Sequence, residues 1–349
     1  MNNKYKWDKK EILKKYMNLK KQKLTFEDEI INNHYMEALM ELLKYNKYES
    51  LINKYPYLLL TKKKLKEEAD YFFNDEITNF QKDAIVNNLD IILDYQNEEE
   101  NDILTNKIDI KDQINLIKEY FSINDKLINK HEELFNKENN FLNITKKYGS
   151  DFFCGSYNDG YITNKNNNNV YGFLALCHEV GHFDEFFTSG EEINKKILID
   201  GEKINNYDEI SSIFYELISI DVLKENNYIS EKEANALYSE TLEINTKNIV
   251  YLDIFKDIYD GKNDKSSKYI HFLETDISDI SIYYYSYLVA TSLFEDYLID
   301  RDKAFYNLNY INNNITQDNE YNVLKYCDID LHNIDKVKNH INRIKKKND

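Results

Sequence analysis

The sequence Cys-His-Glu-Val-Gly-His-Phe at residues 177–183 contains an HExxH motif within an apolar stretch that has helical spacing. Residues four apart on a helix differ by about 400° of rotation, so their side chains leave the same face one turn apart. Two histidines placed in this way can share one zinc ion, and we predict His178 and His182 as zinc ligands. Glu179 is rotated by about 100° from the first ligand, which suits a general base that hydrogen-bonds the water molecule on the metal.

A catalytic zinc site needs a third protein ligand and keeps one position for water. Metzincins use a histidine six residues after the second histidine of the motif, but here Thr188 occupies that position and Glu185 replaces the glycine that they require. That class is therefore excluded. A glutamate on a later helix is the other common solution, and Glu209, 27 residues after the second histidine, is the predicted third ligand. Asp208 and Asp184 are weaker alternatives for a ligand or for a supporting residue.

Glu216 lies seven residues after Glu209, on the same face of the predicted helix but about 10 Å further along its axis. Because it is too far away to reach the same ion, we expect it to brace the histidine-bearing helix from behind the ligands. A purely structural interpretation is the alternative for each residue. His178 and His182 would then be ordinary core or surface residues, and Glu209 would be an acidic residue near a helix N-terminus, where the helix dipole favours it.

The composition excludes several classes of protein. The 349 residues include 45 lysines and arginines against 62 aspartates and glutamates, a net charge of −17, so a nucleic-acid-binding protein is disfavoured. The longest apolar runs are much shorter than the roughly 20 residues of a membrane span. The N-terminus lacks the apolar stretch of a secretory signal, and three cysteines without a CxxC pair indicate no disulfide framework. We therefore expect a cytoplasmic protein.

The sequence pattern predicts a mainly α-helical fold, because one proline and eight glycines leave few helix breakers. Turn-forming residues at 149–170, around a short segment at 160–165, predict a small β-sheet before the HExxH helix. A polar run at 96–101 predicts a linker. We therefore expect an N-terminal helical region at 1–105 and a second domain at 106–349 that carries the HExxH motif.

Four segments in the second domain resemble the thimet oligopeptidase and oligoendopeptidase F group of zinc peptidases, a family of gluzincins. Its members share a strand-and-turn segment, a His-Glu-x-Gly-His helix, a helix of the form Glu-x-x-Ser-x-x-x-Glu and a tyrosine-rich helix near the C-terminus. The matching segments, in the same order, are 154–162, 178–182, 209–216 and 282–288. The resemblance covers roughly residues 118–300 and identifies 106–349 as a zinc peptidase catalytic domain.

The resemblance implies one zinc ion per chain, held by the three ligands named above, with Glu179 activating the water molecule. It further implies that Tyr287, and less strongly Tyr284, donates hydrogen bonds to the oxyanion of the tetrahedral intermediate. Tyr161, Ile162 and Thr163 would form an edge strand that pairs with the backbone of an extended peptide substrate.

The chain also departs from the family pattern. It is shorter than the usual members, and residues 275–281 lack the histidine that many members place before the tyrosines; His271 is the nearest one upstream. The sequence thus predicts a zinc-dependent metallopeptidase that hydrolyses oligopeptides. A non-catalytic helical peptide-binding protein that retains a zinc site is the alternative from another class. A zinc carboxypeptidase on the same scaffold is less favoured, because it needs a cationic group for the substrate C-terminus and Arg301 is the nearest arginine after the tyrosines.

Overall fold

The computed structural model describes residues 62–93, 104–139, 141–144, 151–155, 160–164, 168–189, 207–246, 249–262, 277–316 and 318–346. The predicted linker at 96–101, His271 and most of the predicted N-terminal region lie outside these residues. The contacts divide the chain into two units, one made of 1–70 with 254–276 and the other of 71–253 with 277–349. The division predicted at residue 105 stays a prediction.

The first unit contains most of α4 (Lys62–Tyr71) and the second half of α12 (Val250–Tyr259). The Lys66 ammonium joins the two helices: its Nζ lies 2.7 Å from the carbonyl oxygen of Tyr259 and 5.0 Å from the centre of that ring. Lys66 also pairs with Asp70 one turn further along α4. The contact of Lys66 with Tyr259 places a cation at the C-terminal end of α12, where the helix dipole favours it.

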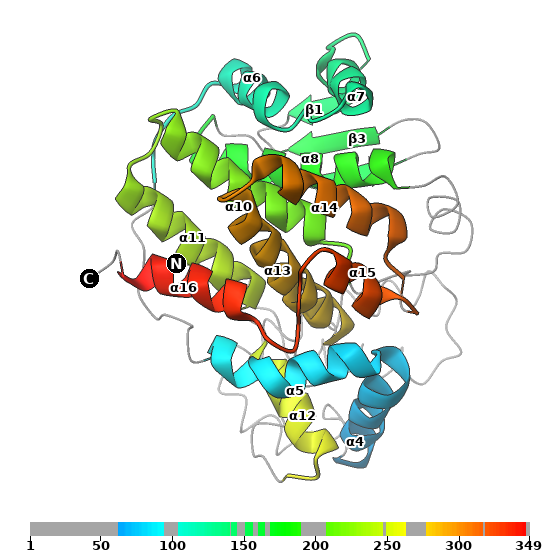
Figure 1. Ribbon diagram of the computed structural model, residues 1–349. Coiled ribbons are helices and arrows are strands. Elements are labelled where there is room, and N and C mark those ends of the chain that lie inside the picture. The colour runs from blue at the N-terminus through cyan, green and yellow to red at the C-terminus, as the bar shows by residue number, and fades with distance from the viewer. Residues whose placement is uncertain are drawn as a thin grey trace, which may run out of the picture. The chain divides into compact units, whose positions relative to one another are not determined.

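The second unit is mainly helical, as expected (Figure 1). Its helices are η2 (Phe72–Glu76), α5 (Asn79–Leu93), α6 (Ile110–Tyr120), α7 (Asp125–Phe135), α8 (Val170–Thr188), α10 (Ile210–Glu225), α11 (Glu231–Thr246), α13 (Ile277–Tyr297), α14 (Arg301–Asn314), α15 (Glu320–Tyr326) and α16 (Asp335–Lys346). None of the described helices offers a stretch long and apolar enough to span a lipid bilayer.

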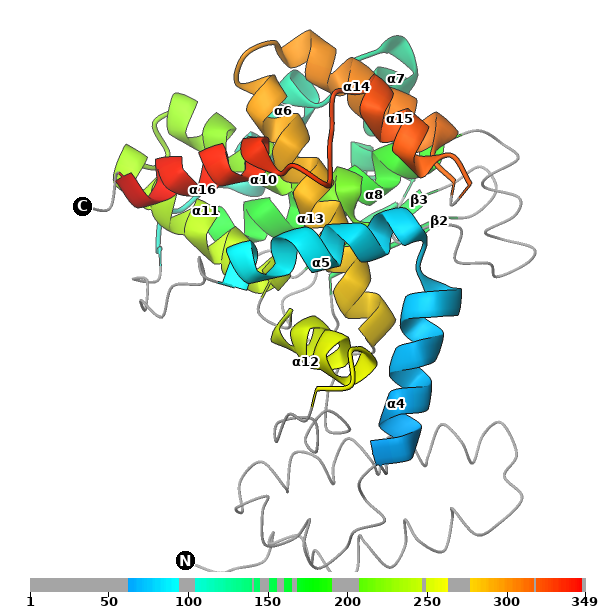
Figure 2. The same ribbon diagram turned by 60° about the horizontal axis from the view of Figure 1, so that its bottom comes forward.

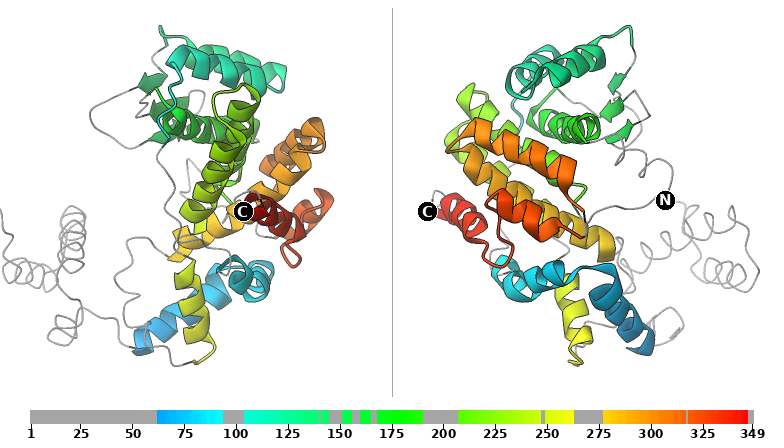
Figure 3. Two further views of the ribbon diagram at one scale, coloured as in Figure 1. Left: turned by 90° about the vertical axis from the view of Figure 1, so that its left-hand side faces the viewer. Right: turned by 45° about the vertical axis from the view of Figure 1, so that its right-hand side comes forward.

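Helix α10 forms the centre of this unit. It is buried around most of its circumference, with Ile213, Phe214, Leu217 and Ile218 fully buried, so both of its faces need partners. It packs against α8 on one side and α13 on the other, while α14 lies beside α13 (Figure 3). This stack of helices holds the HExxH segment in the core of the unit.

Helices α8 and α10 approach each other very closely at Gly181. A Cβ atom at this position would lie 2.6 Å from the Cα atom of Ser212 and 2.7 Å from the carbonyl oxygen of Ser211. Real Cβ atoms do not approach backbone atoms so closely, which explains why the motif has glycine here.

The N-terminus of α8 is set by Asn169, whose side-chain oxygen accepts a hydrogen bond from the backbone N–H of Gly172 at 2.9 Å.

Three short strands precede α8: β1 (Leu142–Ile144), β2 (Phe152–Gly155) and β3 (Gly160–Asn164). Their order is β1-β3-β2, with β3 parallel to β1 and antiparallel to β2, and β2 and β3 both contact α8. The expectation that residues 161–163 form an edge strand is therefore wrong. Strand β3 is central, because β1 pairs with it on one side and β2 on the other.

Candidate metal centre

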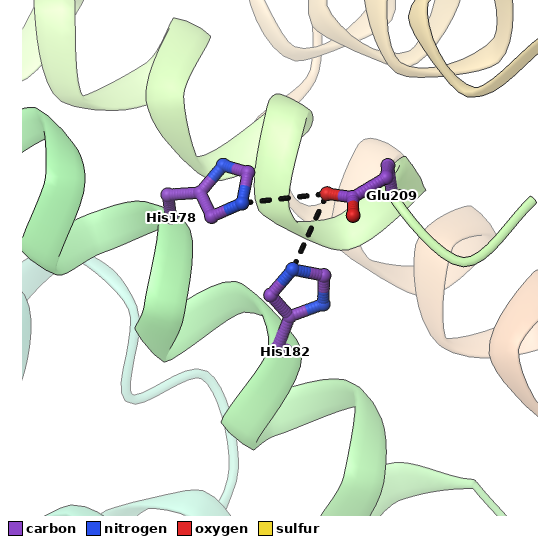
Figure 4. Close-up of side chains that lie close together, drawn as sticks. All are labelled: His178, His182 and Glu209. Carbon is purple, nitrogen blue, oxygen red and sulfur yellow. Dashed lines mark ion pairs between the residues drawn. The ribbon is translucent and has the colours of Figure 1, made fainter. Parts of the chain in front are cut away.

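Two histidines of α8 and one glutamate at the start of α10 bring their ligand atoms together (Figure 4). The Nε2 atoms of His178 and His182 lie 3.3 and 3.2 Å from the Oε2 atom of Glu209. All three ligand atoms lie within 4.8 Å of one another, the one such group among the described histidines, cysteines and carboxylates. The three side chains are 16–21% exposed, so the group is buried on most sides.

The donor set fits a zinc ion. Two imidazoles and one carboxylate are ligands that catalytic zinc sites use, with zinc about 2.0–2.2 Å from each ligand atom. Two such atoms at a tetrahedral angle lie about 3.3–3.6 Å apart, close to the 3.2 and 3.3 Å between the imidazoles and the carboxylate. These two distances are therefore near those of a tetrahedral site.

Helix contacts hold Glu209 in place. Its carboxylate Oε2 accepts a hydrogen bond from the Ser212 hydroxyl at 2.7 Å, and its backbone N–H donates to the Ser286 hydroxyl of α13 at 3.3 Å. Burial acts to raise the pKa of Glu209, but hydrogen bonds from His178 and His182 overcome it and lower that pKa. The carboxylate is thus anionic and fixed by neighbours on two helices.

Glu216 lies against the first histidine, on the side away from Glu209. Its Oε1 atom is 2.6 Å from Nδ1 of His178, while Nε2 of the same ring faces Glu209. A carboxylate only accepts hydrogen bonds, so Nδ1 carries a proton and donates a hydrogen bond to Glu216. In the neutral ring that metal binding requires, the free electron pair would then be on Nε2. Burial alone would lower the pKa of His178, but Glu216 and Glu209 outweigh it and raise the pKa well above its ordinary value.

Glu179 lies on α8, next to His178, and is 5% exposed. Burial raises the pKa of its carboxyl group, an effect that His178 and His182 partly offset. A carboxyl group with a raised pKa beside a group of zinc-binding type is suited to proton transfer near neutral pH.

Two residues weighed as alternative ligands are not part of the group. Asp184 accepts hydrogen bonds from His131 at 2.7 Å and from the Tyr215 hydroxyl at 2.8 Å, so its carboxylate is bound elsewhere. It follows the second histidine by two residues and therefore points about 200° away from it. Asp208 is exposed and is not one of the three converging residues.

The tyrosines of α13 lie mainly in the core. The Tyr284 hydroxyl donates to the Ala84 carbonyl oxygen at 3.2 Å, and the Tyr285 hydroxyl donates to that of Gln81 at 3.1 Å. Both carbonyl groups belong to α5, whose ribbon is labelled in Figure 2. The expectation that Tyr284 stabilises an oxyanion is therefore wrong, because its hydroxyl already donates its proton to the backbone of α5. Tyr287 is 1% exposed, and burial raises the pKa of its phenol.

Sequence reasoning did not identify how Glu209 is held. Ser212 was part of the quoted Glu-x-x-Ser pattern, so a local signal for its hydrogen bond was present. Ser286 is 77 residues from Glu209, and no spacing rule connects them. Its contact depends on how α13 packs against α10.

No protein-family model and no curated protein matches the chain. Solved structures do resemble it. One is a protein assigned as an oligoendopeptidase F from Bacillus anthracis str. Ames, with a TM-score of 0.55 and 12% identity over 92% of this chain and 63% of that one. Another is a protein assigned as a peptidase from Chlamydophila abortus, with a TM-score of 0.52 and 13% identity over 97% of this chain and 62% of that one.

A further structure, also assigned as an oligoendopeptidase F, has a TM-score of 0.51 and 11% identity over 92% of this chain and 66% of that one. At such low identity the likeness shows a shared fold. The chain spans less than two thirds of the length of each of these proteins.

Proposed function

We propose that the chain is a zinc-dependent metallopeptidase that hydrolyses peptide bonds of oligopeptides. The observation that carries the proposal is the convergence of His178, His182 and Glu209, with Glu179 buried on the same helix. The fold shared with proteins assigned as peptidases supports a peptide substrate. The sparse cysteines favour a reducing, cytoplasmic setting.

The three ligands would hold one zinc ion per chain. When bound, zinc supplies Lewis acidity, which lowers the pKa of water toward 7 and polarises a carbonyl group. The ring of His178 is oriented for this role by Glu216, whose carboxylate accepts a hydrogen bond from Nδ1 and so leaves Nε2 to bind the metal. Glu209 is oriented by Ser212.

Glu179 acts as the general base and then as the general acid. Its carboxylate accepts a proton from the attacking water and delivers it to the amine of the leaving peptide. Burial raises the pKa of Glu179 toward the range in which both transfers are efficient, and such catalysis contributes about 10²–10⁴-fold. Tyr287 is the remaining tyrosine proposed to donate a hydrogen bond to the oxyanion, and a protonated phenol is suited to that role.

An endopeptidase is favoured over a carboxypeptidase. The Arg301 guanidinium donates to the carbonyl oxygen of Tyr120 at 2.5 Å and lies 5.0 Å from the centre of that ring. It is thus engaged between α14 and the end of α6, rather than beside the zinc-binding group, where a carboxypeptidase needs its cation.

The test measures zinc content together with cleavage of a quenched fluorescent peptide. We expect about one zinc per chain and cleavage that a chelator abolishes. Glu179→Gln should keep the zinc and lose at least about 10²-fold in turnover, because it removes the base but no ligand. Glu243→Gln, on α11 outside the site, is the control. Zinc without cleavage would favour the non-catalytic peptide-binding protein, and full activity of Glu179→Gln would refute the assigned base.

A further inference from the structure

A network of hydrogen-bonded polar side chains lies on the face of α8 opposite the proposed metal centre. The Ser122 hydroxyl oxygen is 2.8 Å from Nδ1 of His131, and Nε2 of His131 is 2.7 Å from Oδ1 of Asp184. The Tyr215 hydroxyl donates to Oδ2 of Asp184 at 2.8 Å. A serine, a histidine and an aspartate are thus joined in the order that nucleophilic catalysis uses.

The hydrogen bonds specify where the protons lie. An ionised carboxylate only accepts, so Nε2 of His131 donates to Asp184 and Nδ1 is left to accept the Ser122 proton. Burial and the charge of Asp184 raise the pKa of Tyr215 well above its usual value, so its hydroxyl remains a donor. The imidazole therefore has the tautomer of a general base toward Ser122.

Ser122 also lines a pocket of about 680 Å³, within the range of small-molecule sites. Tyr120, Phe305 and Tyr306 give the pocket aromatic walls, and Arg301 lines it as well. The base and its orienting carboxylate are buried, with His131 at 0% and Asp184 at 3% exposure. The serine is thus reached from the pocket, while its two partners are held in the core. This is the arrangement expected of an activated nucleophile.

The network of Ser122, His131 and Asp184 is separate from the proposed metal centre. Asp184 points about 200° away from His182, so the two groups occupy opposite faces of α8. The pocket is formed by the end of α6, the segment that follows it and α14, and none of the three predicted zinc ligands lines it.

We propose that Ser122 is the nucleophile of a second site, which takes small carboxylic esters. Its oxygen attacks the ester carbonyl carbon while its proton moves to Nδ1 of His131, and a new C–O bond forms. The bond to the leaving alcohol then breaks, and that alcohol takes the proton from His131. Water hydrolyses the acyl-serine in the same way, releasing the acid. Arg301 has five N–H donors and gives one to Tyr120, so it retains others for the ester oxygen.

The test uses a fluorophosphonate probe on the full chain, with a chelator present so that the metal centre plays no part. Attack by Ser122 forms an O–P bond and releases fluoride. We expect one adduct, found by mass spectrometry on the peptide that contains Ser122, and none in Ser122→Ala. Ser239→Ala, on α11, is the control and should be labelled like the wild type. Hydrolysis of p-nitrophenyl acetate should follow the same pattern.

Asp184→Asn separates catalysis from a structural role. It removes the carboxylate that orients His131, so we expect labelling to slow by about 10²–10⁴-fold in protein that thermal unfolding shows to be folded. A folded wild type without an adduct on Ser122 would overturn the proposal. Labelling of Ser122 at an unchanged rate in folded Asp184→Asn would overturn it as well. Neither result depends on whether the metal centre is active.

Discussion

Glu216 and Ser286 contact the predicted zinc ligands from two different helices, and only one of these contacts was predictable. The spacing of seven residues placed Glu216 on the ligand face of the helix but out of reach of the ion. The hydrogen bond of 2.6 Å from His178 to Glu216 agrees with that reasoning. Ser286, like the partners of Asp184, is brought in by packing between distant segments, which local spacing does not encode.

Replacing Glu216 tests whether a residue that binds no metal controls the affinity for zinc. In Glu216→Ala the Nδ1 proton of His178 loses its acceptor, so the ring is no longer held with Nε2 toward Glu209. We expect the dissociation constant for zinc to rise about 10–100-fold. Competition with a chromophoric chelator measures it. Glu225→Ala, at the exposed end of the same helix, is the control, and equal affinities in all three proteins would contradict the role of Glu216.

At the level of helices and strands, the position of an element in its sheet was harder to predict than its existence. The turn residues on both sides of 160–164 predicted a strand there. Its central place depends on β1, which pairs with it in parallel through residues about twenty positions earlier. Alternating side chains identify a strand but not its neighbours, because pairing is a contact between distant parts of the chain.

The contact between α8 and α10 predicts that a glycine-to-alanine substitution in a helix lowers the stability of the fold instead of raising it. Alanine normally stabilises a helix by up to about 1 kcal/mol relative to glycine. At Gly181 its Cβ atom would meet the backbone of Ser211 and Ser212, so the two helices must separate. We expect Gly181→Ala to destabilise the fold by about 1–3 kcal/mol, the usual range for overpacking. Equilibrium denaturation in urea measures this, and a more stable variant would contradict the close approach.

On the scale of the whole molecule, the helical class could be predicted from the sequence, whereas no feature of the sequence indicated the two units into which the contacts divide the chain. The scarcity of proline and glycine predicted helices throughout, and the described residues are mainly helical. The first unit, however, combines residues before 71 with residues 254–276. Such interleaving depends on which distant segments pack together, whereas composition and polar runs reveal only boundaries that are continuous along the chain.

Removing the metal should destabilise the fold, because the three ligands join α8 to the start of α10. A ligand that binds only the folded state stabilises it by about 4.1 kcal/mol at a free concentration of 1,000 times its dissociation constant. We therefore expect a chelator to lower the melting temperature of the wild type by several degrees in differential scanning calorimetry. His182→Ala should melt at one temperature with or without chelator, since it lacks a ligand. An equal decrease in both proteins would show that the chelator acts elsewhere, and no decrease in the wild type would contradict a bound zinc.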